Sequence, residues 1–403
     1  MSGAFILGGL RTPRAKASKR GALATVPPLE LLAGLQRALP ARTGLDPGFV
    51  DDVLAGCASQ VDGQGANIAR TATLLAGWGE DIPGATINRF CASGIDAVNT
   101  AAARVSGGDS GLIVAGGVES VSQVPLFADR GPLFTDPAVM ARVGSVHMGI
   151  AADLVASLEG YERDELDDYA FRTREKARRA WEAGRLAPCV APVLNAAGAV
   201  LCDHDEYVSY APTRAELAAL PAAFGALGAE GQDSLALARY TRLREIRHLH
   251  TKATSPPMAD AAALVLVGSA AAAARAGMRP RARIVATATC AVEPVIMLTA
   301  GQLAIEQVLR KAGLSADDVE LFEFAEAFSA LCLKLERELR IGDDRLNVNG
   351  GTMALGHAFG ATGAILILNL VEELERRGAR YGVAAVSSAA GLGVATLVER
   401  VTN

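Results

Sequence analysis

Two residues in this sequence could carry covalent chemistry, Cys91 and His357. Cys91 lies in the run NRFCASG, between a β-rich approach over residues 85–87 and an alanine-rich helical pattern over residues 95–105. Unpaired N–H groups and the dipole at a helix N-terminus stabilise a thiolate, so this position predicts a nucleophilic cysteine. The alternative is a buried and inert cysteine, which is the more common kind.

His357 ends the glycine-rich run NVNGGTMALGH, which begins at Asn347. Glycines on both sides let the backbone curl, which places the imidazole in a tight, accessible turn. A histidine in such a turn could deprotonate a thiol or donate an N–H to a developing oxyanion. A lone histidine is more often structural, but this turn has a counterpart around Cys91.

The outer thirds of the chain share one order of elements. Each has a reactive residue, a small-residue turn (Ala92–Gly94 or Ala361–Gly363), a long helix, a buried strand and a glycine turn. This order predicts two copies of one α/β unit, with parallel or mixed sheets covered by helices on both faces. Packing the two copies together would bring Cys91 and His357 toward a shared site.

The middle of the chain, residues 121–251, has a different pattern. It is rich in proline, has charge-dense helical patterns over residues 162–182 and 215–222, and has few strand signals. We therefore expect an inserted, mostly helical segment. A basic helical stretch is expected over residues 225–250, either as a solvated face or as a phosphate contact, with Arg239, Arg242, Arg244 and Arg247.

Length and composition limit the possible functions. The 403 residues, half of them hydrophobic, can form two or three domains' worth of core. The net charge of -5 gives no general attraction to nucleic acid or anionic lipid. Six scattered cysteines without a CxxC pair indicate free thiols and imply no metal or redox cofactor. No secretory signal is visible and the longest apolar run, residues 364–371, is too short for a membrane span, so a cytoplasmic protein is expected.

The chain resembles the thiolases, which are acyl-CoA:acetyl-CoA C-acyltransferases. The likeness covers the whole length, and several motifs in the family's order are more specific than one glycine-rich match. The motifs are Asn88–Gly94, Gly116–Ser120, Asn347–Gly351 and Ala354–His357, together with Arg11–Pro13, His147–Gly149 and Gly391–Ala395.

The resemblance implies a fold of two βαβαβαββ halves in a five-layered α/β/α/β/α arrangement, with an inserted CoA-binding loop domain. The expected boundaries are 1–120 for the first half, with return strands around 252–268, then 121–251 for the insertion and 269–403 for the second half. It also implies coenzyme A thioesters as substrates, no tightly bound cofactor, and a homodimer or homotetramer.

The resemblance assigns roles to individual residues. Cys91 corresponds to the acylated nucleophile, and His357 to the histidine that activates it and helps to form an oxyanion hole. A second oxyanion hole would use the backbone N–H groups of Cys91 and Ala389. The positions expected to contact CoA are Ser255, His147, Met148 and Phe328.

Several positions depart from the family pattern. Ala325 replaces an asparagine that holds a catalytic water, Ser387 replaces the second catalytic cysteine, and Ala358 replaces a proline. The CoA-contacting run is also altered over residues 253–260, where Ser255 lies one position from the family's serine. A serine hydroxyl is a far weaker acid than a thiol of pKa about 8.5, so acylation of Cys91 should survive better than carbon–carbon bond formation.

The leading hypothesis is a thiolase-type acyltransferase that forms an acyl-thioester on Cys91. One alternative is a diverged acyl-transfer or condensing enzyme with a different acceptor. Another is a non-catalytic CoA-binding scaffold, against which the presence of both Cys91 and His357 argues.

Overall fold

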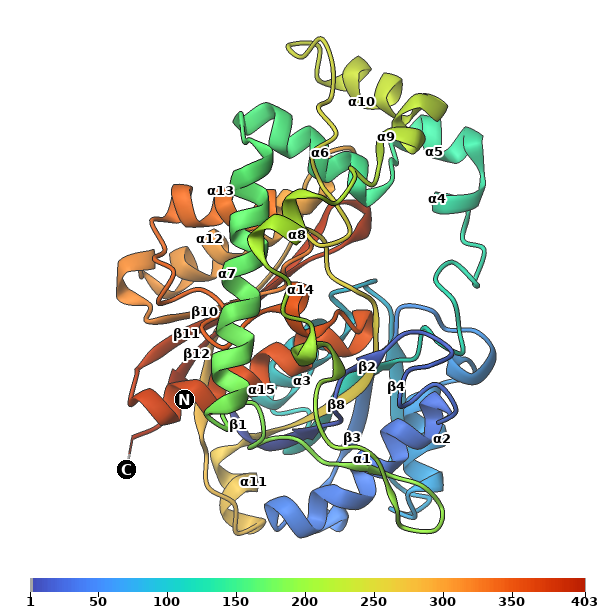
Figure 1. Cartoon of the computed structure of the whole chain (residues 1–403). Helices are drawn as coiled ribbons and strands as arrows, with labels where there is room; N and C mark the ends of the chain where they lie inside the picture. Colours follow the sequence, from blue (N-terminus) through green and yellow to red (C-terminus); the bar gives the residue numbers. More distant parts are fainter. Residues whose placement is uncertain (1–2, 403) are drawn as a thin grey trace.

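The computed structural model describes residues 3–402 and is built around one mixed β-sheet (Figure 1). Residues 1, 2 and 403, which the expected boundaries include, lie outside the described residues. The N-terminal half supplies β1 (Ala4–Arg11), β2 (Ala15–Lys16), β3 (Asp52–Gly56), β4 (Gly84–Ile87), β5 (Leu112–Glu119) and β8 (Ala259–Ser269). The C-terminal half supplies β9 (Ala282–Ala291), β10 (Leu321–Phe324), β11 (Tyr381–Ser387) and β12 (Leu392–Arg400).

The two halves repeat one strand order, β4-β3-β5-β8-β1 in the first and β10-β11-β12-β9 in the second. In the first half β4, β3 and β5 are parallel, and β8 and β1 follow antiparallel. In the second half β10 and β11 are parallel, and β12 and β9 follow antiparallel. At the outer edge of β10, an isolated parallel bridge pairs Phe322 with Leu346. Leu346 thus occupies the position that β4 has in the first half. The predicted duplication is confirmed, and the halves join where β1 pairs with β9.

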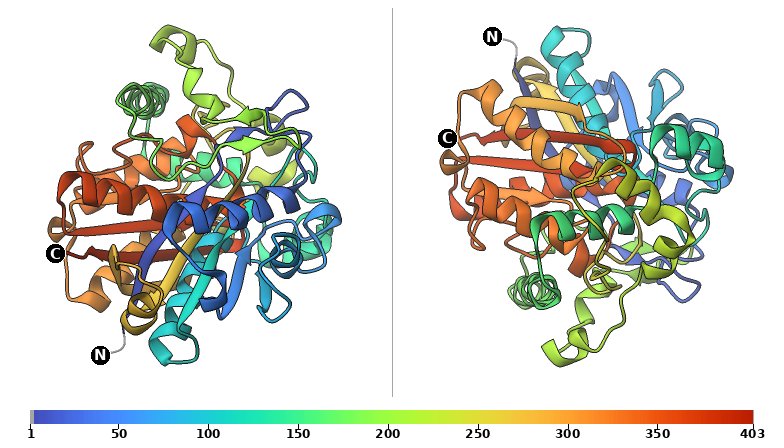
Figure 2. Two further views of the ribbon diagram at one scale, coloured as in Figure 1. Left: turned by 90° about the horizontal axis from the view of Figure 1, so that it is seen from below. Right: turned by 90° about the horizontal axis from the view of Figure 1, so that it is seen from above.

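Helices cover both outer faces of the sheet and fill the space between its halves (Figure 2). The central pair is α3 (Ser93–Gly107) and α15 (Phe359–Arg377), which pack against each other. Side chains alternate along β8, so Ala263 and Val265 join the central core whereas Leu264 and Leu266 join the outer core. The outer helices are α1 (Pro28–Thr43), α2 (Ile68–Leu75) and α11 (Ala270–Arg275) on one half, and α12 (Ala300–Ala312) and α13 (Ser329–Leu339) on the other. The five-layered arrangement is therefore confirmed.

The insertion between β5 and β8 contains mainly helices and loops, with one short hairpin. Its longest helix, α7 (Arg163–Glu182), lies along the C-terminal half and contacts α13 and the short α14 (Thr352–Leu355) (Figure 1). The remaining elements are α4 (Pro132–Thr135), α5 (Pro137–Val143), α6 (Met148–Glu159), β6 (Val193–Leu194), β7 (Val200–Cys202), α8 (Arg214–Ala218), α9 (Gly225–Leu227) and α10 (Asp233–Arg239).

The basic helical stretch expected over residues 225–250 is wrong in its second part. The helical turns end at Arg239, and residues 240–250 have no regular secondary structure. Gly231, at φ +108°, interrupts the turns between α9 and α10. The four arginines therefore do not share one helix face, because the chain carries no continuous helix on which to place them.

One stretch, residues 137–159, is long and apolar enough for a membrane-spanning helix, and half of its window is buried inside the protein. The structure divides this stretch into α5 and α6, with Gly144 in the left-handed region at φ +75° between them. The core helix of a soluble protein meets the same criteria, so length and composition are weak evidence for a span here.

Candidate active site

Cys91 lies in a tight turn directly before α3. The preceding Phe90 has φ +48°, a strained conformation for a residue with a side chain. The Ser93 hydroxyl fixes the turn, since it accepts from the N–H of Arg89 at 2.8 Å and donates to the carbonyl of Phe90 at 2.6 Å. The helix start therefore lies beside the sulfur, as the sequence predicts.

The helix start is not the only influence on the Cys91 thiol. Burial, followed by the nearby carboxylate of Glu119, raises the pKa of the thiol to about 12. Hydrogen bonds from the Ser388 hydroxyl and from the N–H groups of Cys91 and Ala389 lower this pKa only in part. A neighbouring base would therefore assist reaction of this thiol, and the N–H groups of Cys91 and Ala389 lie close to its sulfur.

His357 is held by its backbone and by its ring. Its N–H donates to the carbonyl of Pro257 at 2.8 Å, and its carbonyl accepts from the N–H of Ala259 at 2.9 Å. Its Nδ1 pairs with the hydroxyl of Thr362 at 2.9 Å, and this oxygen also accepts from the N–H of Ala358. Burial lowers the pKa of His357 to about 4, so the imidazole is neutral at physiological pH and able to accept a proton.

The starts of α3 and α15, which directly follow Cys91 and His357, pack against each other. Gly94 and Gly360 are in close contact, because a Cβ atom on Gly94 would lie 2.4 Å from the carbonyl oxygen of Gly360. The ring of Phe359 lies 4.5 Å from the ring of His357 and also lines the cavity that contains Cys91. That cavity has a volume of about 40 Å³, and its other walls include Phe90, Phe127, Phe134, Met148 and Ala389.

The residues expected to contact CoA fall into two groups. Met148 lines the Cys91 cavity, and His147 beside it caps α6, with Nδ1 accepting from the N–H of Gly149 at 3.0 Å. The rings of His147 and Phe328 both pack on Phe224, at 5.5 and 5.7 Å. Ser255 lies apart from this group in the described contacts, and its hydroxyl donates to the carbonyl of Thr251 at 3.1 Å.

At the end of β11 the structure places Ser388, rather than Ser387, beside Cys91. The Ser387 hydroxyl donates to the carbonyl of Leu298 at 2.6 Å and accepts from the N–H of Gly301 at 3.0 Å. The Ser388 Oγ atom lies 2.9 Å from the carbonyl oxygen of Arg89 and also faces Cys91, whose pKa it lowers. Successive residues of a strand point to opposite faces, a pattern that could have identified Ser388.

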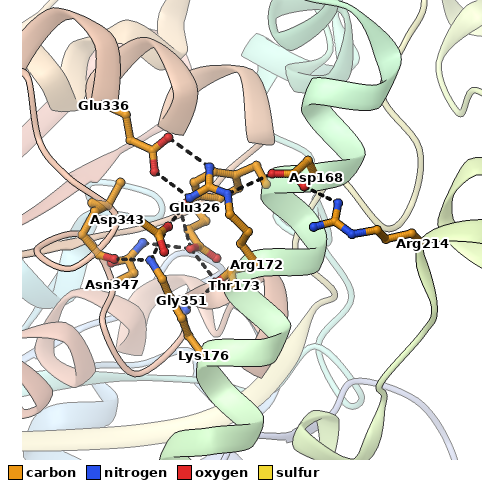
Figure 3. Close-up of polar contacts among 12 residues, drawn as sticks. Asp168, Arg172, Thr173, Lys176, Arg214, Glu326, Glu336, Asp343, Asn347 and Gly351 are labelled. Carbon is orange, nitrogen blue, oxygen red and sulfur yellow. Dashed lines mark hydrogen bonds and ion pairs between the residues drawn. The ribbon is translucent and has the colours of Figure 1, made fainter.

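Ala325 offers no polar side chain, but its neighbour Glu326 is a structural centre that sequence reasoning missed. The buried Glu326 carboxylate accepts from Thr173 of α7 at 2.8 Å and from Asn347 at 2.9 Å, and Thr173 in turn accepts from the N–H of Gly351 at 3.0 Å (Figure 3). The Glu326 carboxylate also accepts from the hydroxyl of Tyr169 and from the backbone N–H of Met353. These bonds fasten the loop that leads to His357 onto the inserted helix.

A second polar group on α7 supports this attachment. Arg172 pairs with Asp168 on its own helix and with Glu336 of α13, each at 3.1 Å, and also contacts Asp343 (Figure 3). Between residues 3 and 402, no group of three or more His, Cys, Asp or Glu side chains is placed to hold a metal ion.

Fold and site together define a duplicated α/β protein with a cysteine and a histidine at paired helix starts. The model of the thiolase N-terminal domain matches residues 4–230, and that of the thiolase C-terminal domain matches residues 278–400. The chain belongs to the thiolase family. It is a thiolase-type acyl-CoA C-acyltransferase, as its motifs predicted.

Individual relatives agree with this assignment. A 3-oxoadipyl-CoA/3-oxo-5,6-dehydrosuberyl-CoA thiolase of Escherichia coli is 36% identical, with 100% of both chains covered. A 3-ketoacyl-CoA thiolase of Colwellia psychrerythraea is 34% identical, again over 100% of both. The crystal structure of the Bacillus anthracis acetyl-CoA acetyltransferase superposes with a TM-score of 0.85 at 30% identity, covering 100% of this chain and 99% of the other.

Proposed function

We propose that Cys91 accepts an acyl group from a coenzyme A thioester with His357 as the base. His357 takes the thiol proton as the sulfur attacks the thioester carbonyl, the bond to the CoA sulfur breaks, and the proton passes to the departing CoA thiolate. The observation that carries this proposal is geometric: Cys91 and His357 precede the packed helices α3 and α15, and Phe359 touches the His357 ring while it lines the Cys91 cavity.

The oxyanion that forms on the thioester carbonyl needs donors. The N–H groups of Cys91 and Ala389 are directed toward the sulfur, which supports their use as one oxyanion hole. Met148 in the cavity wall, with His147 and Phe328 around Phe224, supports a CoA path on this side of Cys91. Ser255 remains a proposed contact further along that path.

The step that follows acylation in thiolases, formation of the carbon–carbon bond, lacks its usual side chains in this protein. The Ser387 hydroxyl is engaged by Leu298 and Gly301, and Ala325 has no side chain able to hold a water. We therefore propose that acyl transfer to Cys91 is faster than carbon–carbon bond formation, with a diverged acceptor as the alternative. A cavity of about 40 Å³ walled by aromatic rings supports a short acyl group.

Intact-protein mass spectrometry tests the proposal directly. Acetyl-CoA should add one acetyl group to the wild-type protein and none to Cys91→Ala, while Cys290→Ala, a half-buried cysteine in the other half, should still be acetylated. His357→Asn should slow acylation by about 10²–10⁴-fold. An adduct that persists in Cys91→Ala would refute Cys91 as the acceptor. Formation of acetoacetyl-CoA at the rate of acylation would refute the slower carbon–carbon bond formation.

We further propose a homodimer or homotetramer in the cytoplasm. Strand β4 ends the sheet, and its outer edge pairs with no strand in residues 3–402. An unpaired edge is a ready site for a second copy of the chain. Sedimentation of the purified protein tests this, and a monomer at micromolar concentration would refute it.

A further inference from the structure

A second cavity, with a volume of about 370 Å³, lies apart from the one at Cys91 and shares no lining residue with it. Three cationic side chains line it, Lys16, Arg174 and Lys252, together with Tyr207 and Tyr210. They come from β2, from α7, from the segment before β8 and from the chain after β7. The fold therefore gathers positive charge at one hollow from parts of the chain far apart in sequence.

Arg174 is the unusual member of this group, because it is 7% exposed and has no carboxylate partner. Its guanidinium donates only to the carbonyls of Ala170 at 2.6 Å and Ala253 at 2.8 Å. Burial accordingly lowers the pKa of Arg174. Two other deeply buried arginines, Arg11 and Arg14, differ from Arg174 because both form ion pairs with the carboxylate of Asp205. The charge of Glu326 acts on Arg174 but forms no ion pair with it, and a buried charge without a directly contacting counterion is unfavourable, so Arg174 favours an anion within contact distance.

The other residues around this cavity do not pair ionically with its cations. Neither Lys16 nor Lys252 forms an ion pair with any described residue. Two carboxylates in this region make their hydrogen bonds elsewhere: Glu206 accepts from the backbone of Lys16 at 2.7 Å, and Glu326 accepts from four neutral donors. The two tyrosine rings lie beside the cations, with Lys16 Nζ 5.7 Å from Tyr207 and Arg174 Cζ 5.6 Å from the ring of Tyr210. They offer flat apolar walls next to the charge.

We propose that this cavity binds a small organic anion through a phosphate or carboxylate group held by Arg174, Lys16 and Lys252. Its volume exceeds that of a bare inorganic ion and falls in the range of small-molecule sites, and the tyrosines face the body of the ligand. The inference does not rest on acylation of Cys91.

The cavity also borders the segments that hold His357. Pro257 lines it and accepts the N–H of His357 at 2.8 Å, while Met353 lines it from α14, which leads into the histidine turn. The hydroxyl of Tyr207 donates to the carbonyl of Met258 at 3.0 Å. An anion seated here touches both sides of the histidine turn, so its binding should alter the acylation rate of Cys91.

The test uses the full chain in phosphate-free buffer, with inorganic pyrophosphate and citrate as probes and calorimetry as the readout. Each probe should bind the wild type and raise its Tm. Lys252→Gln, at an exposed position, should weaken binding about tenfold, and Arg174→Met should abolish it. Arg310→Gln, an exposed and unpaired arginine on α12, should bind as the wild type does. Failure of both probes to bind, or equal binding by Lys252→Gln and wild type, would overturn the site.

A second arm separates two sources of the same chemistry. If pyrophosphate competes with CoA but not with pantetheine, and Lys252→Gln weakens CoA binding, the cavity takes the phosphates of CoA. If CoA binding is unchanged in Lys252→Gln while pyrophosphate binding falls, the cavity takes a free anion. Acylation by an acyl-pantetheine, which lacks the phosphates, reports on Cys91 separately, so failure of one proposal leaves the other measurable.

Discussion

The buried carboxylate of Glu119 accepts the backbone N–H of Gly360 at 3.0 Å, which ties the end of β5 in the first half to the start of α15 in the second. The same carboxylate accepts from the N–H of Ala58 at 2.9 Å and from Gln64 at 2.7 Å. The same carboxylate also raises the pKa of Cys91. One side chain therefore both links the two halves and disfavours ionisation of the thiol.

Replacing this carboxylate should therefore change reactivity and stability in opposite senses. In Glu119→Gln the loss of negative charge lowers the pKa of Cys91, so alkylation of Cys91 by iodoacetamide should reach a given rate at lower pH. The new amide N–H₂ opposes existing donors, which should cost about 1–3 kcal/mol in urea unfolding. Glu230→Gln, at an exposed carboxylate, is the control and should change neither. An unchanged alkylation profile in Glu119→Gln would contradict the electrostatic role.

The contact between the two helix starts predicts a sharp difference between two glycines of α3. Gly94→Ala places a Cβ atom 2.4 Å from the carbonyl of Gly360, so the helices must separate, at a cost of about 1–3 kcal/mol. Gly107→Ala, near the end of the same helix, meets no atom within 4 Å and should be neutral or stabilising by up to about 1 kcal/mol. Chemical denaturation of both variants checks this, and equal stabilities would refute the close contact.

Ser387 and Ser388 are adjacent but should behave differently. Ser388→Ala removes a hydrogen bond that lowers the pKa of Cys91, so the pH profile of Cys91 alkylation should move to higher pH. Ser387→Ala leaves the buried N–H of Gly301 without its partner, so it should lose about 1–3 kcal/mol of stability while leaving that profile in place. Peptide mass spectrometry of alkylated Cys91 across pH 6–10 distinguishes the two. The reverse assignment would show that Ser387 is the residue facing the thiol.

The pH dependence of acylation follows from the two pKa values. His357 becomes protonated only near pH 4 and Cys91 ionises only near pH 12, so the competent pair of neutral thiol and neutral imidazole dominates between them. Acetylation by acetyl-CoA should be nearly constant from pH 6 to 9 and should fall as His357 gains a proton at lower pH. Alkylation by iodoacetamide, which needs the thiolate, should rise about tenfold per pH unit over the same range. A steep rise in acetylation between pH 6 and 8 would show that Cys91 ionises before it reacts.

Much of the fold could be predicted from the sequence because its long elements carry clear patterns. The repeated turns before α3 and α15 predicted the duplication, and residues 162–182 formed the expected helix. Strand β10 was not predicted, because its four residues, Leu321–Phe324, are all buried and show no alternation. Helix α2 begins at Ile68 because Asn67 caps it, accepting from the N–H of Arg70 at 3.3 Å.

The sequence was sufficient to predict which residues form the site, but not which groups surround them. Local sequence placed Cys91 at a helix start, where a lowered pKa is the natural expectation. Burial and the carboxylate of Glu119, which the fold brings in from the end of β5, instead raise the pKa of this thiol. The same holds for the four donors around Glu326 and for the unpaired charge of Arg174, since each joins residues from separate segments.

The position of β8 has a consequence for synthesis of the chain. Strands β3, β4 and β5 can pair as soon as they leave the ribosome, but β1 reaches them only through β8, residues Ala259–Ser269. The nascent chain must therefore carry β1 and one edge of β5 unpaired while the whole insertion is translated. Exposed strand edges of this kind favour aggregation and chaperone binding. Slowing translation within the insertion would lengthen that vulnerable interval.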